Sequence, residues 1–186
     1  MEKGRIIFMN GVSSSGKTTL AKALQAHFEK HYYLLSGDVF INMASAKHSN
    51  WEIERFPKAW LKEALTGMHH TIKLYSDIGY NTIVDHVLLN VLESLKECVE
   101  LLHDYPVLFV RVTCPTEELR RREKERGDRE VGQAESQLSI LEPQDIYDIT
   151  VDTHSETQDE CISKISNALN FGNFTAFKTI WSQWVY

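Results

Sequence analysis

The sequence has few cysteines and no long apolar run. Its three cysteines lie far apart and lack C-x-x-C spacing, which argues against a disulfide framework and against a cysteine-based zinc site. No segment approaches the roughly 20 apolar residues that cross a bilayer, so we expect no membrane span. Residues 1–4 run directly into a short apolar segment rather than a long hydrophobic signal. These absences together predict a cytoplasmic protein.

Excess positive charge is also missing. The chain has 20 Lys and Arg against 26 Asp and Glu, a net charge of -6, so we expect no nucleic-acid partner. The guanine-recognition patterns Asn-Lys-x-Asp and Thr-Lys-x-Asp do not occur, which argues against a GTPase. At 186 residues and 42% hydrophobic content, the chain is long enough for one well-filled core and short for two. We therefore expect a single domain over residues 1–186.

What the sequence does contain is a phosphate-binding pattern near its start. Residues 11–18 read G-V-S-S-S-G-K-T, which fits G-x-x-x-x-G-K-[ST] between a strand-like and a helix-like segment. Such a loop turns successive amide N–H groups toward phosphate oxygens, and the following helix adds the positive end of its dipole. Lys17 would supply a cation for the outer phosphates, and Thr18 a hydroxyl for Mg²⁺. The alternative, a serine-rich turn capping a helix, needs neither the lysine nor the second glycine.

This loop predicts that the chain binds a nucleoside triphosphate. The residues expected to bind it here are Gly11, Ser13, Ser14, Ser15, Gly16, Lys17, Thr18 and Thr19.

Short apolar runs alternate with amphipathic stretches along the chain. The runs predicted as buried strands are 5–9, 32–35, 82–84, 107–112 and 147–151. Helical spacing predicts one long helix over 57–76. Alternating strands and helices require parallel pairing with right-handed crossovers, so we expect an α/β fold: a doubly wound, five-stranded parallel sheet between two helical layers. Ligands then bind at the carboxyl ends of the strands.

Two carboxylates and a histidine follow the second and third predicted strands. Asp38 lies near the phosphate loop and is our candidate base, which would orient an acceptor hydroxyl and take its proton. Asp85 ends the third strand, where a carboxylate orients Mg²⁺, and His86 beside it is a candidate substrate contact. Two alternatives stay open: Asp38 as the N-cap of a helix beginning at Val39, and His86 as a satisfied structural group. The adjacent His69 and His70 point about 100° apart on a helix, which predicts surface and partly buried residues rather than metal ligands.

Segment 119–129 concentrates five arginines in an otherwise acidic chain. In small phosphate-loop kinases this position leads into a lid whose arginines neutralise charge on the transferring phosphoryl group, so we expect a helical lid over about 120–137. Arg126 and Arg129 flank Gly127 and are predicted to be catalytic, whereas Arg122 is assigned to the nucleotide. For Arg120 and Arg121 the favoured reading is a solvated helix face with ion pairs to Glu123 and Glu125.

Aromatic residues gather in two places. Phe40 and Trp60 belong to an apolar patch at 40–60, beyond Asp38, that suits a ringed small molecule, although such residues also fasten helices to a sheet. The C-terminal extension, about 171–186, carries a stripe of aromatic residues at helical spacing: Phe174, Phe177, Trp181 and Trp184. The stripe predicts a helix that packs on its own domain, with self-association into a homo-oligomer as the alternative.

With these motifs the chain resembles the chloramphenicol phosphotransferase-like family of small phosphate-loop kinases. The resemblance rests on the loop at 11–18 and on the segments Gly37-Asp38-Val39-Phe40, Val84-Asp85-His86-Val87-Leu88, Arg122 to Arg129, and Tyr147 to Thr153. It implies the doubly wound kinase sheet, ATP with Mg²⁺ as donor, and Asp38 as the base for a substrate hydroxyl. Gly132, Ala134 and Gln137 keep the family's Gly-x-Ala-x-x-Gln segment, but the Val-His pair that follows it in the family is missing, since no histidine lies between Gln137 and Tyr147.

The motifs favour an ATP-dependent kinase that phosphorylates a hydroxyl of a small molecule, a chloramphenicol-type antibiotic or a related acceptor. A nucleoside or nucleotide kinase is one alternative, although a nucleotide's phosphate needs arginine clamps and the region 38–60 offers only Lys47, Arg55 and Lys58. A nucleotide-dependent switch protein without an acceptor is the other.

Overall fold

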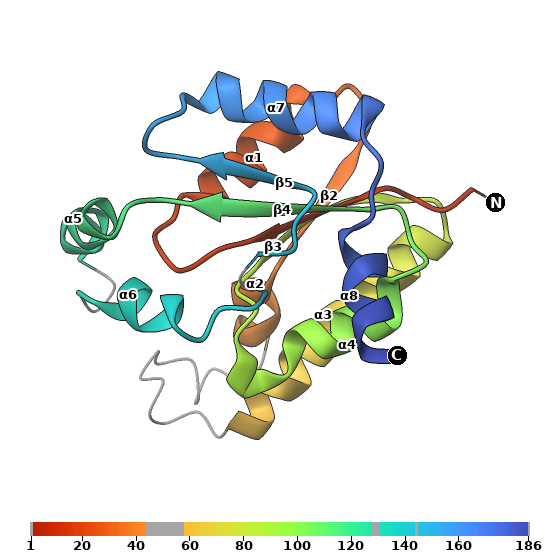
Figure 1. Ribbon diagram of the computed structural model, residues 1–186, viewed down its shortest axis with the longest axis horizontal. Helices are drawn as coiled ribbons and strands as arrows, with labels where there is room; N and C mark the ends of the chain where they lie inside the picture. The colour runs from red at the N-terminus through yellow and green to blue at the C-terminus, as the bar shows by residue number, and fades with distance from the viewer. Residues whose placement is uncertain (1, 44–57, 128–130, 144, 186) are drawn as a thin grey trace.

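The computed structural model describes residues 2–43, 58–127, 131–143 and 145–185. Its centre is a parallel five-stranded sheet in the order β2-β3-β1-β4-β5, with helices on both faces (Figure 1). The strands are β1 (Ile6–Asn10), β2 (Tyr32–Ser36), β3 (Asn81–His86), β4 (Val107–Thr113) and β5 (Ile149–Asp152). The helices are α1 (Lys17–His27), α2 (Gly37–Asn42), α3 (Lys58–Asp77), α4 (Ser94–Leu102), α5 (Thr116–Arg126), α6 (Gln133–Leu138), α7 (Gln158–Phe171) and α8 (Ala176–Val185), with a 3-10 turn at Asn90–Leu92. The predicted doubly wound sheet is confirmed.

The three central strands, β1, β3 and β4, are buried along most of their length because both faces of the sheet are covered. In β1, Ile6 and Phe8 belong to the core under α3, α4 and α8, whereas Ile7 and Met9 belong to the core under α1 and α7. Successive strand side chains point to opposite faces, so a continuous apolar run fills both layers. Figure 1 shows α1 and α7 on one side of the sheet and α3, α4 and α8 on the other.

The helix expected over 57–76 is α3, and it is amphipathic. Its buried residues are Leu65, Met68, His69, Ile72 and Ser76, which recur at helical spacing along one face. Among the described residues, no helix has the length and apolar character needed to cross a membrane.

The parallel register brings the polar strand ends to one edge. Asn10 of β1 pairs with His86 of β3, and Asp85 pairs with Ser36 of β2. On the other side, Thr113 of β4 pairs with Asp152 of β5. The phosphate loop, the acidic residues and the segment that begins α5 therefore lie together at the carboxyl edge, toward which the arrowheads point in Figure 1.

The C-terminal helix α8 is anchored through Asp148. One carboxylate oxygen of this residue accepts hydrogen bonds from the amides of Thr175 (2.8 Å) and Ala176 (3.0 Å), and the other accepts from Phe109 N (2.8 Å). Phe177 then packs against the rings of Phe8 and Phe109, with centroid distances of 5.5 and 4.9 Å.

The expected aromatic stripe divides among three environments. Phe177 and Trp181 pack on the sheet's own core, and Trp181 also stacks on His103 at 4.5 Å. Phe174 lies before the helix and packs with the opposite layer, whereas Trp184 is exposed. The stripe therefore packs on its own chain through its central residues.

Candidate active site

The phosphate loop needs both of its glycines. A Cβ on Gly11 would lie 2.3 Å from the carbonyl oxygen of Val112, because β4 passes directly beside it. Gly16 has φ 89°, a left-handed conformation that starts α1 and that glycine adopts without strain. The hydroxyl oxygens of Ser14 and Ser15 are buried and have no hydrogen-bond partner among the described residues. Unsatisfied donors at the helix N-terminus fit a phosphate group.

Lys17 is nearly buried and curls back over the loop. Its side chain is 6% exposed, and Nζ donates a hydrogen bond to the carbonyl oxygen of Val12 at 2.8 Å. A plain helix cap would not need this arrangement. The phosphate loop itself therefore fixes the position of the Lys17 ammonium group, through the Val12 carbonyl.

A first cavity of about 440 Å³ lies on the α7 side of the loop. It is lined by Ser14, Gly16, Lys17, Thr18, Thr19, Leu20, Arg122, Glu125, Arg126, Thr153, Glu156, Gln158 and Cys161. Six of the residues predicted to bind the nucleotide are in this wall. The other three, Gly11, Ser13 and Ser15, lie in the same loop but do not line this cavity.

Arg122 joins three parts of the first cavity. Its guanidinium group donates to the side-chain and carbonyl oxygens of Thr153, both at 3.0 Å, and to Ser14 O at 3.4 Å. Its Nε donates to Glu118 at 2.8 Å. Thr153 in turn donates to the carbonyl oxygen of Ser15 at 2.7 Å, so α5, the residue that follows β5 and the loop form one hydrogen-bonded wall.

A second cavity of about 200 Å³ lies on the α3 side. Asp38, Asp85 and His86, three of the residues expected near a substrate, line it. Its apolar lining comes from Ile41, Leu61, Leu65, Val87, Leu89 and Leu92.

Phe40 and Trp60 do not line this second cavity. Phe40 packs against the core, and Trp60 is 39% exposed. Neighbours in sequence, Ile41 and Leu61, face the cavity in their place. Met43 is exposed, and the other members of the expected patch, Trp51, Ile53 and Phe56, lie outside the described residues.

The two cavities meet at four side chains: Ser14, Lys17, Thr18 and Arg126. Two of these residues are cationic. A phosphoryl group held at this junction can be reached from either side, which is the geometry that direct transfer between two bound molecules requires.

Asp38 stands at the start of α2 without being its N-cap. The helix begins at Gly37, and Ser36 with extended backbone occupies the N-cap position. The alternative of Asp38 as an N-cap before Val39 is therefore wrong, because the helix starts two residues earlier than that reading requires. Asp38 is exposed and faces the second cavity.

Thr18 and Asp85 place two hard oxygen ligands together. The Thr18 hydroxyl donates to the Asp85 carboxylate at 2.5 Å, and Asp85 is 8% exposed. A hydroxyl and a carboxylate oxygen beside a phosphate loop have the chemistry that Mg²⁺ prefers. The predicted metal residues are thus adjacent, although they come from α1 and β3.

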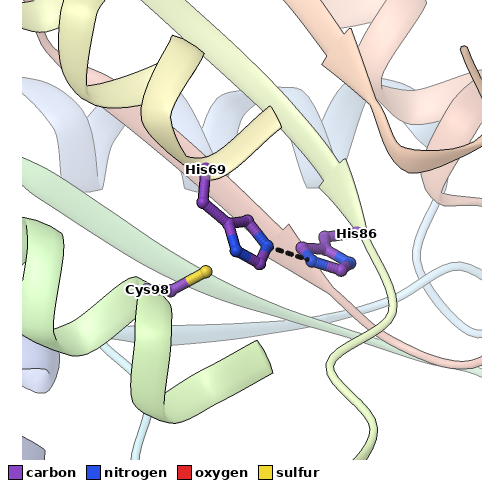
Figure 2. A group of neighbouring side chains, drawn as sticks. All are labelled: His69, His86 and Cys98. Carbon is purple, nitrogen blue, oxygen red and sulfur yellow. Dashed lines mark hydrogen bonds between the residues drawn. The ribbon is translucent and has the colours of Figure 1, made fainter. Parts of the chain in front are cut away.

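Behind the second cavity lies a buried histidine pair (Figure 2). His86 is 3% exposed and His69 is fully buried, with 2.8 Å between their Nε2 atoms. Burial lowers the pKa of His86 well below its usual value, and His69 and Lys17 lower it further. Burial also lowers the pKa of His69, against the opposing effect of the Glu97 carboxylate. The expectation that His69 is a surface or partly buried residue is wrong; its spacing from Leu65 and Ile72 was the available signal.

These buried histidines predict loss of stability in mild acid. Histidines in the unfolded chain titrate near pH 6.5, whereas the folded pair has lowered pKa values. Below pH 6.5 the unfolded chain therefore binds more protons than the folded chain, and the free energy of unfolding falls. We expect the urea midpoint to be lower at about pH 5.5 than at about pH 7.5, a window above the titration of most carboxylates. His69→Gln should flatten this dependence. A midpoint that is unchanged or higher at the lower pH would contradict the prediction.

The segment expected to form a lid contains α5 and α6, which Glu123 joins. This carboxylate is fully buried and accepts hydrogen bonds from the amides of Gly132 and Ala134, both at 2.7 Å. The expectation that it forms a surface ion pair is therefore wrong. Gln137, which we did not assign a role, accepts a hydrogen bond from Ser13 N at 2.7 Å and so joins α6 to the phosphate loop.

The arginines of α5 fall into two groups: Arg120 and Arg121 form ion pairs on the exposed face, whereas Arg122 and Arg126 line cavities. Arg120 pairs with Glu135 at 2.6 Å, and Arg121 pairs with Glu118 and Glu125 on the exposed face. Arg126, in the last turn of the helix, lines both cavities. Arg129 lies outside the described residues, so its catalytic role stays a prediction.

Arg126→Ala should lower turnover more than it lowers nucleotide affinity. The guanidinium group lies where the cavities meet, and a cation placed there acts most strongly on charge that develops during transfer. We expect a loss of about tenfold to a hundredfold in kcat with a much smaller change in nucleotide Kd, measured by ADP release and by titration. Lys124→Ala is the matched control, because Lys124 lies on the same helix and lines neither cavity. Weaker binding with unchanged turnover would overturn the assignment.

A family model for chloramphenicol phosphotransferase-like proteins matches residues 4–170. The chain belongs to this family. The resemblance found in the sequence is thereby confirmed. This chloramphenicol phosphotransferase-like protein is a kinase-type phosphotransferase, as its motifs predicted.

Kinases and phosphotransferases are among the known proteins similar to this family member. A "Putative O-phosphotransferase" of Mycobacterium tuberculosis is 30% identical over 173 residues, which cover 82% of this chain and 76% of the relative. An adenylyl-sulfate kinase of Clostridium acetobutylicum is 27% identical over 173 residues, covering 88% and 82%. The structure of the Mycobacterium tuberculosis APS kinase in complex with AMPPNP and APS matches with a TM-score of 0.68 at 18% identity, over 91% of this chain and 99% of that one. This likeness confirms the kinase fold.

Proposed function

We propose that the protein transfers the γ-phosphate of ATP to a hydroxyl group of a small molecule with an apolar body, a chloramphenicol-type antibiotic or a related acceptor. The observation that carries the proposal is the junction of two cavities over Lys17 and Arg126. One cavity includes the phosphate loop and suits the donor. The other carries a carboxylate and an apolar wall and suits the acceptor.

The residues of the junction have separate roles in this proposal. Asp38 accepts the proton of the acceptor hydroxyl and orients its oxygen toward the γ-phosphorus. Lys17 and Arg126, with Arg129 as a further candidate, stabilise negative charge on the transferring group. Thr18 and Asp85 would hold Mg²⁺, which supplies charge neutralisation to the phosphates. Arg122 and Thr153 hold the donor side of the loop.

A kinase for a nucleotide-like acceptor is the second candidate, because adenylyl-sulfate kinases are among the relatives. The second cavity favours the first candidate. Its six apolar side chains provide a surface for a ring or an aliphatic body. An anionic acceptor would be recognised by arginine clamps, and among the described residues that line this cavity the cations are Lys17 and Arg126, which the proposal assigns to the transferring phosphoryl group.

A coupled assay of ADP release tests the proposal. The purified protein is incubated with ATP and Mg²⁺, with and without single acceptors: chloramphenicol, other hydroxylated antibiotics, neutral metabolites and adenylyl sulfate. Acceptor-dependent ADP release that Asp38→Asn abolishes supports the proposal. Release with adenylyl sulfate alone establishes the second candidate. ADP release that no acceptor stimulates would favour a nucleotide-dependent switch.

A further inference from the structure

A chain of hydrogen bonds runs from α4 to the wall of the second cavity. Glu97 Oε2 lies 2.8 Å from His69 Nδ1. His69 Nε2 lies 2.8 Å from His86 Nε2, the contact drawn as a dashed line in Figure 2. At the far end, the amide of Val87 donates to His86 Nδ1 at 2.8 Å. His86 and Val87 both line the cavity. Three elements, α4, α3 and the end of β3, are thus joined through two imidazole rings.

The proton positions in this chain follow from its ends. A backbone amide can only donate, so His86 Nδ1 must be the bare nitrogen and Nε2 must carry the proton. His69 Nε2 then accepts, and His69 Nδ1 donates to the Glu97 carboxylate. One arrangement satisfies every donor and acceptor, with both rings neutral.

This arrangement argues against a metal centre, although Cys98 brings a third ligand atom within 4.8 Å of the two histidines. A metal on His86 Nε2 would leave the ring proton on Nδ1, pointing at the Val87 N–H. Two donors would then face each other in a buried place. A buried unsatisfied donor costs roughly 1–3 kcal/mol.

The hydrogen bond from the Val87 amide to His86 Nδ1 also argues against a proton relay out of the cavity. A proton could enter the chain only at His86 Nδ1, and the Val87 amide occupies that atom. The chain therefore fixes geometry rather than conducting charge. Beyond Val87, the amide of Leu88 donates to Asn10 Oδ1 at 2.9 Å, so the strand exit is held from two sides.

We propose that His69 and Glu97 are positioning residues for the acceptor side of the site: they fix the His86 ring, and that ring holds the Val87 amide and the cavity wall from Val87 to Leu89. The part of this inference that concerns acceptor binding rests on the proposed function. The positioning itself does not. Neither residue lines the cavity, so neither touches the acceptor directly.

Histidine side-chain NMR tests the positioning without donor or acceptor. In the ¹⁵N-labelled full chain, we expect His86 as the Nε2–H tautomer and His69 as the Nδ1–H tautomer. Glu97→Ala removes the outer partner of His69 at a partly exposed position and should mix the tautomers and shift the Val87–Leu89 amides. Glu100→Ala is the matched control, because Glu100 is exposed on the same helix and pairs with Lys96.

Two substitutions at His69 separate positioning from packing. A glutamine amide has an acceptor for His86 and a donor for Glu97, so His69→Gln should retain the wild-type amide shifts of Val87–Leu89. His69→Phe keeps a ring but neither polar atom, and these shifts should change. With chloramphenicol as the acceptor probe, the KM for acceptor should rise about tenfold in His69→Phe and stay near wild type in His69→Gln, while the KM for ATP is unchanged.

The outcomes that overturn the proposal are specific. They are His86 as the Nδ1–H tautomer, amides at Val87–Leu89 that Glu97→Ala leaves unmoved, or stoichiometric Zn²⁺ binding that shifts both rings and raises the melting temperature. If the wild-type protein does not phosphorylate chloramphenicol, that result counts against the proposed acceptor class, and the NMR measurements still decide the positioning.

Discussion

Replacing Lys17 with alanine should abolish phosphoryl transfer. Lys17 is 6% exposed, its ammonium group donates to the Val12 carbonyl, and its side chain lies where the first and second cavities meet. Charge stabilisation in such a water-poor place is strong, and loss of a single group of this kind costs on the order of 10²–10³ in turnover or more. ADP release in the coupled assay should fall to background at saturating ATP.

Lys22→Ala is the matched control for this experiment. Lys22 lies on the same helix, α1, but its side chain is exposed and lines neither cavity. Its replacement should leave turnover unchanged. If Lys17→Ala retained nucleotide-dependent activity, the assignment of the phosphate loop would have to be abandoned.

Asp38→Asn should bind ATP normally and lose transfer. The amide keeps the size and position of the side chain at the start of α2, but it cannot take the proton of an acceptor hydroxyl. General bases contribute roughly 10²–10⁴ to rate, and we expect a fall in kcat within that range. Nucleotide Kd from titration should stay within about twofold, because Asp38 lines only the second cavity.

Asp159→Asn controls for the helix position. Asp159 is the second residue of α7, as Asp38 is of α2, and it is exposed. Both aspartates interact favourably with a helix N-terminus, so both substitutions remove the same dipole contribution. If Asp38→Asn reduced turnover by less than about tenfold, Asp38 would serve the helix rather than the reaction.

Sequence reasoning works best here where the physics is local. The phosphate loop is one continuous segment whose glycines, lysine and hydroxyl act together, so its pattern alone predicted its conformation. The strands follow from apolar runs, because both faces of a parallel sheet are buried. The contact of Thr18 with Asp85 could also be expected, since parallel strands bring their carboxyl ends to one edge.

The remaining parts depend on neighbours that are distant in sequence. The role of His69 appears only when α3 is laid beside the end of β3 and against Glu97 of α4. Glu123 looked like one more charge on a solvated helix, yet α6 buries it completely. The local sequence pattern does not indicate which helix will cover a given side chain.

The apolar wall of the second cavity shows the same limit for single residues. Phe40 and Trp60 were predicted to line it, but Ile41 and Leu61 do so. A shift of one residue turns a side chain by about 100° around a helix, so composition of a segment cannot select the face that meets the cavity. The register of α2 and α3 against the sheet decides this, and that register is a tertiary property.

The four side chains shared by the two cavities have a kinetic meaning. Two ligands that contact the same side chains do not bind independently. The charge of the first ligand changes the affinity for the second, and this coupling is reciprocal. Both ligands must be bound before the phosphoryl group is transferred, so we expect sequential kinetics. A single molecule that occupies both cavities would act as a bisubstrate inhibitor.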